Sequence, residues 1–194
     1  STSGVYGDCQ GARIDETRPL QPQNARALRR VDAEHTLRRW AVRSSSRLFI
    51  LRAPGIYAAD RLPLERLRNG TPALAAGDDV HTNHIHADDL ALLVVRALQR
   101  GAANRVYHAS DDSELAMGAY FDLVADRFGL PRPPRLPRAQ LAAQVSPVLL
   151  SFMSESRRMD NRRLKAELGY RLRYPTVAAM LAGLVDCGFA KDPA

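Results

Sequence analysis

STSGVYGD, at residues 1–8, places serine, threonine and glycine next to one another and predicts the end of a strand that runs into a loop. Parallel α/β sheets bind their ligands at the ends of strands, so hydroxyl groups at such a point are candidate ligand contacts. Clusters of these residue types also form ordinary turns, and the stretch alone does not separate the two interpretations. The rest of the chain has to decide between them.

Alternating helix and strand patterns follow this stretch. Residues 24–43 predict a long helix, and RLFILR at 47–52 predicts a buried strand that Pro54-Gly55 stops. The proline-rich PRPPRLPR at 131–138 predicts an extended connector at a lobe boundary or pocket rim. Strands that alternate with helices indicate an α/β layer, and the helix-rich tail indicates a cap. The other predicted elements are helices at 62–68, 88–100, 139–153, 160–168 and 175–187, strands at 80–86 and 105–109, and a helix that ends near Phe128 with N-cap oxygens from Asp111, Asp112 or Ser113.

Composition places the chain among ordinary globular proteins, with 45% apolar and 25% charged residues. The net charge of +7 invites an anionic partner, but the arginines are spread along the chain and aromatic residues make up only 6%. We therefore expect no nucleic acid as partner. The longest apolar run, Leu90–Val95, is too short to span a membrane. Cys9 and Cys187 form no disulfide framework, so we expect a cytoplasmic protein.

Six motifs in order resemble the extended short-chain dehydrogenases/reductases. Val5-Tyr6-Gly7 matches the end of their S-[ST]-x-x-VYG signature, and Glu34 matches the glutamate of the helix that follows. The branch that the chain resembles most is the atypical, YeeZ-like group of the NAD-dependent epimerase/dehydratase family. The other matching stretches are RPLQP (18–22), LRAPGIY (51–57), HIHADDLA (84–91), RVYHASDDS (105–113) and DNRRLKAELGY (160–170).

The resemblance implies an α/β fold, a partial Rossmann-like parallel sheet with helices plus a mostly helical C-terminal substrate lobe. Residues 1–57 and 83–110 would belong to the sheet domain, 58–82 to a substrate-lobe insertion and 111–194 to the substrate lobe. The family's GxGxxG fingerprint is absent from the sequence. We therefore expect a C-terminal fragment that binds NAD or NADP poorly alone, and an intact protein that binds it.

The family's catalytic pair departs most from the pattern. Counting from Pro22 and from Glu34 places its Tyr-x-x-x-Lys at Arg26 and Arg30. Arginine stays protonated in proteins, so Arg26 cannot act as a base. An equally weighted interpretation makes both arginines solvated residues of a basic helix.

The resemblance also implies the site residues. Thr2 falls on the catalytic Ser/Thr, and remaining acid/base work would fall to Tyr6, Tyr57 or a histidine such as His86. The implied cofactor contacts are Pro54, Gly55 and Ile56 near the nicotinamide and Arg30 near its ribose, and the implied substrate contacts are Arg157 and Arg158.

A histidine cluster offers a different interpretation. His81, His84 and His86 precede Asp88 and Asp89, a grouping that superficially resembles a metallohydrolase loop. The favoured interpretation is a helix start, in which the two aspartates cap the following helix, and no metal site is predicted.

The parent function implied is NAD(P)-dependent oxidoreduction, epimerisation or dehydration of a small molecule, with a nucleotide-sugar as candidate substrate. A homodimer is compatible with this class, and no membrane partner is expected. The alternatives are a catalytically inactive NAD(P)-binding or regulatory protein and, with less support, a zinc hydrolase.

Overall fold

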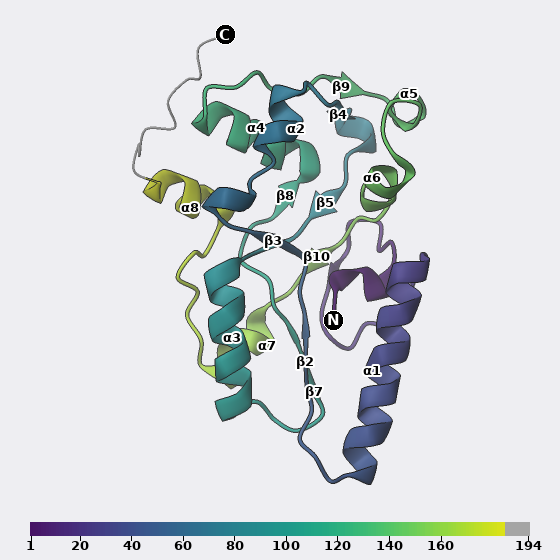
Figure 1. The fold of residues 1–194 in the computed structure, drawn as a ribbon, viewed down its shortest axis with the longest axis vertical. Helices are drawn as coiled ribbons and strands as arrows, with labels where there is room; N and C mark the ends of the chain where they lie inside the picture. The colour runs from purple at the N-terminus through teal and green to yellow at the C-terminus, as the bar shows by residue number, and fades with distance from the viewer. Residues whose placement is uncertain (185–194) are drawn as a thin grey trace.

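The computed structural model describes residues 1–184, and the elements are arranged in two stacked halves (Figure 1). The helices are α1 (Ala25–Arg43), α2 (Leu64–Arg68), α3 (Ala87–Arg100), α4 (Met117–Arg127), α5 (Arg138–Ala142), α6 (Pro147–Phe152), α7 (Arg162–Leu168) and α8 (Val177–Gly183), with 3-10 turns η1 (Ser3–Tyr6), η2 (Ala59–Arg61) and η3 (Ala76–Asp78). The strands are β1 (Arg13–Ile14), β2 (Phe49–Arg52), β3 (Gly55–Tyr57), β4 (Ala73–Leu74), β5 (His81–Thr82), β6 (His84–His86), β7 (Arg105–His108), β8 (Leu115–Ala116), β9 (Arg135–Leu136) and β10 (Arg158–Met159).

Short parallel strand pairs carry the α/β layer. β2 pairs with β7 in parallel, and a further bridge joins Thr2 to Ala53, just beyond β2. Helix α1 lies on one side of this pair and α3 on the other (Figure 1). The pairs β1–β10, β3–β6 and β4–β9 are also parallel, whereas β5–β8 is antiparallel. The predicted α/β class with parallel strands is confirmed.

Helix α1 forms where the sequence predicts it. The Asn24 side chain accepts a hydrogen bond from the Ala27 amide at 3.0 Å and caps the first turn. Ala27, Glu34 and Ala41, spaced seven residues apart, are its buried positions. The remaining positions are mostly arginines and other exposed residues, so one narrow stripe packs inward and the rest of the helix surface faces water or the cavity described below.

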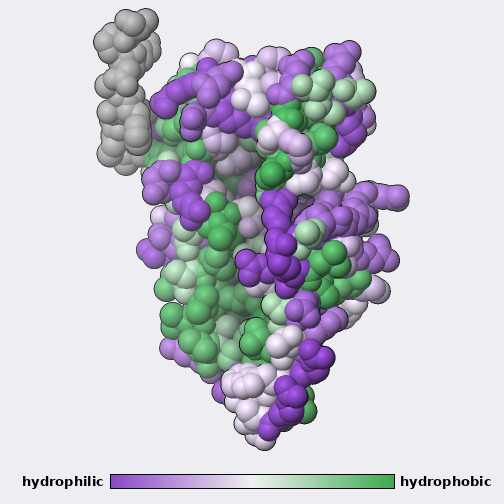
Figure 2. Space-filling model, turned by 45° about the vertical axis from the view of Figure 1, so that its right-hand side comes forward, coloured by the Kyte–Doolittle hydropathy of each residue, from purple (hydrophilic) through white to green (hydrophobic). Residues whose placement is uncertain are grey.

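Two hydrophobic clusters form most of the core. The upper cluster includes Tyr57, Phe121, Val124 and Met180, and the lower cluster packs Leu93 and Tyr107 against α7. Hydrophobic surface is also visible over the lower half, around α1, α3 and the β2–β7 pair (Figure 2). Residues 1–184 include no helix that is both long and apolar enough to cross a bilayer.

Several predicted boundaries are wrong in detail. The strand predicted at 80–86 is interrupted at Asn83, because β5 pairs with β8 and β6 with β3. The helix predicted at 139–153 is two short helices, α5 and α6. The helix predicted at 175–187 is α8 as far as Gly183; the end of that prediction, with Cys187, lies outside the described residues.

The predicted caps are also wrong. Asp79, not residues 111–113, accepts the Gly118 amide in the first turn of α4, at 3.0 Å. The Ser113 hydroxyl instead accepts a hydrogen bond from Val177 of α8 at 2.9 Å. At α3 the predicted helix start is confirmed, with Asp88 and Asp89 in the first turn, but the His86 ring, not an aspartate, accepts the Asp88 amide at 3.2 Å. Caps supplied from distant segments leave no local sequence pattern, and this explains the errors.

Candidate functional site

A cavity of about 770 Å³ opens between α1 and the upper half of the molecule. It is large enough for a cofactor-sized or substrate-sized ligand. Its wall combines η1, the first turns of α1, β3, the β5–β6 segment, α4 and α6. The lining includes Thr2, Ser3, Gly4, Asn24, Arg26, Arg29, Arg30, Pro54, Gly55, Ile56, Tyr57, His81, Asn83, His84, Tyr120, Phe121, Phe152, Glu155 and Arg157.

Thr2 stands at the cavity wall at the end of its bridge to Ala53. Its hydroxyl oxygen is the cap of η1, accepting the Gly4 amide at 3.5 Å, and the side chain stays partly exposed. Gly7 closes the turn with a φ of 64°, and a Cβ there would lie 2.1 Å from the Gln21 carbonyl oxygen. The glycine of the VYG motif is therefore required by geometry, and it fixes the turn that presents Thr2.

The segment Pro54–Ile56 lines the cavity with little side-chain cover. Gly55 is exposed, and it pairs with His84 across the β3–β6 ladder. A Cβ at Gly55 would meet the Asn83 carbonyl oxygen at 3.4 Å and His84 Cδ2 at 3.7 Å, which are ordinary contacts. The absence of a side chain here leaves room for a flat ring to approach the backbone.

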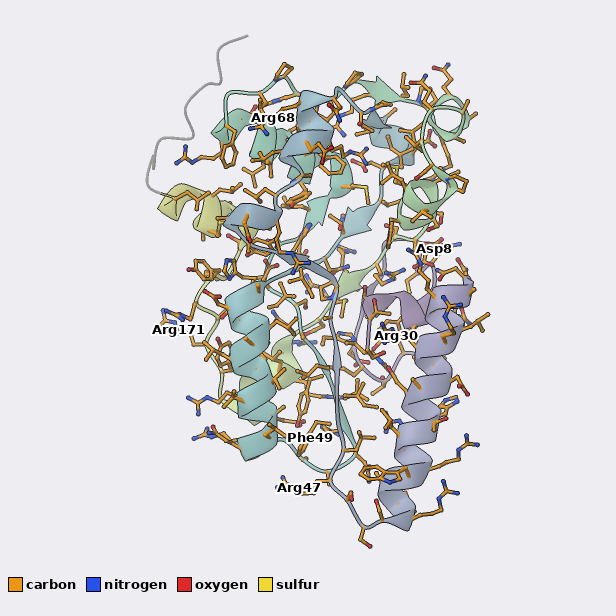
Figure 3. All side chains as sticks on the ribbon, in the orientation of Figure 1. Asp8, Arg30, Arg47, Phe49, Arg68 and Arg171 are labelled. Carbon is orange, nitrogen blue, oxygen red and sulfur yellow. The ribbon has the colours of Figure 1, made fainter. Side chains whose placement is uncertain are left out.

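Three arginines of α1 reach the same cavity: Arg26, Arg29 and Arg30. Arg30 lies on the side of α1 that faces the strands (Figure 3). Arg26 donates to the Ser151 hydroxyl at 2.8 Å and stacks on Phe152 at 4.2 Å. Among the described residues, no carboxylate forms an ion pair with any of the three.

The two arginines predicted to contact substrate go to different places. Arg157 lines the cavity, but its side chain is buried, pairs with Glu155 and donates to the Gly7 carbonyl at 3.0 Å. Arg158 donates to the Gly11 carbonyl at 2.8 Å and borders a separate hollow of about 80 Å³. Arg157 lies just before β10 and Arg158 begins it, and the two side chains contact different parts of the fold.

Tyr6 does not reach the cavity. It is fully buried, and its hydroxyl bonds His108 Nε2 at 2.5 Å and accepts from Arg52 at 2.6 Å. Burial raises the pKa of Tyr6 to about 12, although Arg52 pulls the other way. The structure therefore separates Tyr6 from Thr2 and gives it structural partners, whereas Tyr57, also buried, does border the cavity.

His84 is a cavity residue that the sequence interpretation missed. It is 4% exposed, lies 4.4 Å from the Tyr120 ring between centroids, and its buried Nδ1 has no hydrogen-bond partner. Burial lowers the pKa of His84 to about 4, so the ring is neutral near pH 7. Alternation along 80–86 places His84 and His86 on one face, but it does not tell which ring reaches a cavity.

The histidine cluster does not assemble a metal site in the described part of the chain, where no group of three or more His, Cys, Asp or Glu side chains is placed to hold an ion. His86 instead stacks on Tyr174 at 3.8 Å between centroids. Asp89 is fully buried and accepts hydrogen bonds from Tyr170 and from the backbone at Arg173 and Tyr174.

Comparison with known proteins gives matches by structure. No protein-family model and no curated protein sequence matches the chain. A conserved protein of unknown function from Silicibacter pomeroyi matches with a TM-score of 0.80 and 35% identity, over 94% of this chain and 63% of that one. A protein described as an NAD-dependent epimerase/dehydratase, from Methylobacillus flagellatus, matches with a TM-score of 0.68 and 26% identity, over 94% and 60%.

UDP-glucose 4-epimerase from Thermotoga maritima, solved with UDP-glucose, matches with a TM-score of 0.74 and 17% identity, over 93% of this chain and 59% of that one. The chain thus spans about three fifths of the length of these structures. These matches show that the chain has the parallel α/β fold of NAD-dependent epimerase/dehydratase proteins, and its ordered motifs resemble those of the short-chain dehydrogenases/reductases.

Proposed function

We propose that the whole protein is an NAD(P)-dependent oxidoreductase, epimerase or dehydratase that acts on a small molecule, with a nucleotide-sugar as the leading candidate. In this proposal the nicotinamide lies against Pro54, Gly55 and Ile56, with Arg30 near its ribose, and Thr2 bonds the reacting oxygen of the substrate. Residues 1–57 and 83–110 form the sheet domain, and residues 58–82 and 111–194 form the substrate lobe.

One observation carries the proposal: Thr2, Pro54–Ile56 and Arg30, which come from three separate stretches of sequence, line one cavity. The bare backbone at Gly55 fits the approach of a flat ring, and the aromatic side chains of the upper half supply an apolar wall. The structural neighbours include an epimerase solved with UDP-glucose, which supports the choice of substrate class.

The residue at position 26 bears on whether the protein is an active enzyme or an inactive cofactor-binding protein. It lines the cavity where the resemblance expects the family's tyrosine, and a guanidinium does not release a proton at neutral pH. The second candidate function is therefore an NAD(P)-binding regulatory protein without turnover. Cofactor binding without conversion of any substrate in a panel of UDP- and dTDP-sugars, followed by chromatography of the sugar products and, for net oxidoreduction, by the absorbance of reduced cofactor, would favour that candidate.

The test of the cofactor position is Gly55→Val in the product of the full reading frame. The Cβ of the new side chain meets only ordinary contacts within the fold, so we expect unchanged folding and at least a tenfold weaker affinity for NADPH and NADH by calorimetry. Gly77→Val is the matched control, since a Cβ there has nothing within 4 Å and the residue lies outside the cavity. Equal affinity in both variants would contradict the proposed position.

A further inference from the structure

The charge around the cavity is unbalanced. Four arginines line it, Arg26, Arg29, Arg30 and Arg157, against one carboxylate, Glu155. Glu155 is already engaged by Arg157 and by the Asn24 amide at 3.1 Å. The three arginines of α1, which we call the arginine rim, are therefore left without a counter-charge among residues 1–184.

The arginine rim comes from helical spacing. Positions 26, 29 and 30 lie on one face of α1, because residues three and four apart are neighbours on a helix. Arg26 is held in place by Ser151 and by the Phe152 ring, whereas Arg29 and Arg30 are exposed at the cavity. Cations at the mouth of a cavity with low-dielectric walls concentrate anions there.

The other walls are aromatic and neutral. Tyr57, His84, Tyr120 and Phe121 line the cavity from β3, β6 and α4. His84 carries no charge near pH 7, and its unpartnered Nδ1 leaves hydrogen-bonding capacity unused in this wall. The unpaired positive charge of the cavity therefore comes from the arginines on the α1 side. The aromatic wall on the opposite side offers a surface on which a ring can pack.

We propose that the arginine rim binds an oxyanion of the ligand, a carboxylate or a phosphate, while a ring of the same ligand packs against the aromatic wall. Guanidinium groups suit both oxyanions because their planar donors match two oxygens at once. This inference rests on the proposed function and deepens it, because it names the charge of the substrate. It places that charge at the helix where the family resemblance expects a phenol and an amine.

The test uses the chain itself and three sugars that share one ring: glucuronate, glucose 1-phosphate and neutral glucose. Dissociation constants come from NMR shifts of the arginine Nε–H signals at low ionic strength. We expect at least one of the two anions to bind about tenfold more tightly than glucose. The anion that does so identifies the source of the oxyanion, and added salt should weaken its binding.

Variants locate the site. Exposed ion pairs are weak individually, so Arg29→Gln or Arg30→Gln should each weaken anion binding about threefold, and the double variant about tenfold. Arg39→Gln, on the same helix but outside the cavity, should change it less than twofold. Glucose binding as tight as both anions, no binding by either anion, or an unchanged double variant would overturn the inference. Because no cofactor or turnover is involved, such a failure would leave the cofactor test of the proposed function intact.

Discussion

At the scale of single residues, the VYG tyrosine belongs to a buried hydrogen-bond chain. Arg52 pairs with Glu34 through two hydrogen bonds of 3.0 and 2.6 Å and donates to the Tyr6 hydroxyl. The Asp160 carbonyl accepts a hydrogen bond from His108 Nδ1. His108 Nε2 is therefore the acceptor for the hydrogen bond from the Tyr6 hydroxyl. Every side chain of this hydrogen-bonded series has a hydrogen-bond partner, as a buried ion pair requires. Its role is to join α1, η1, β2 and β7.

Asp111 is a buried carboxylate with one unpaired oxygen. It is 4% exposed, and although Ser113 donates to one oxygen, the other has no partner. Burial raises its pKa to about 7 from an ordinary value near 4. The folded state therefore binds this proton more strongly, and the stability it contributes is present below about pH 4 and lost as the pH rises through 7.

The measurement compares Asp111→Asn with the unchanged chain by urea unfolding between pH 4 and 8. Asparagine keeps the acceptor for Ser113 and does not titrate. We expect its free energy of unfolding to rise relative to the unchanged chain by up to about 4 kcal/mol across this range. Parallel stability curves would show that Asp111 does not titrate abnormally.

At the scale of elements, Asp89 fastens α3 to the segment that follows α7. Its carboxylate accepts from the Tyr170 hydroxyl at 2.7 Å and from the backbone amides of Arg173 and Tyr174, both at 2.9 Å. Replacing it with alanine leaves these buried donors unpaired, so Asp89→Ala should destabilise the fold by about 3 kcal/mol in chemical denaturation. The neighbouring Asp88→Ala is the control. Its exposed side chain should contribute less than about 0.5 kcal/mol to the free energy of unfolding. Equal losses of stability in the two variants would refute the role of Asp89.

Elements with a local cause were predictable from sequence. Helix α1 begins at its local Asn24 cap, and the end of α7 follows from Gly169, which adopts a φ of 58°. The cap of α4 was not predictable, since Asp79 lies 39 residues before its partner Gly118. The same limit applies to the 80–86 segment, where the identity of each partner strand decides the break at Asn83.

Part of the candidate site was also predictable from the sequence, and part of it was not. Motif order was enough to predict that Thr2, Pro54–Ile56 and Arg30 belong together, and all of them line the cavity. Burial was not readable from the motif, so Tyr6 was predicted as a catalytic residue although it is enclosed. His84 opens the HIHADDLA motif, but the motif does not tell that its ring reaches the cavity; the pairing of β3 with β6 places it there.

At the scale of the whole molecule, elements of both stacked halves line the cavity. The lower half supplies the α1 and η1 walls, and α4 and α6 close the cavity from above. Such a junction between a sheet layer and a lobe is a common place for ligands. The fold agrees with that of structural neighbours of which this chain spans about three fifths.

The most direct test of the account is a crystal structure of the full reading frame's product with bound NAD or NADPH. We expect the nicotinamide ring within about 4 Å of the Pro54–Ile56 backbone and the ribose next to Arg30. A dinucleotide bound elsewhere, or a cavity that stays free of cofactor at saturating concentration, would contradict it.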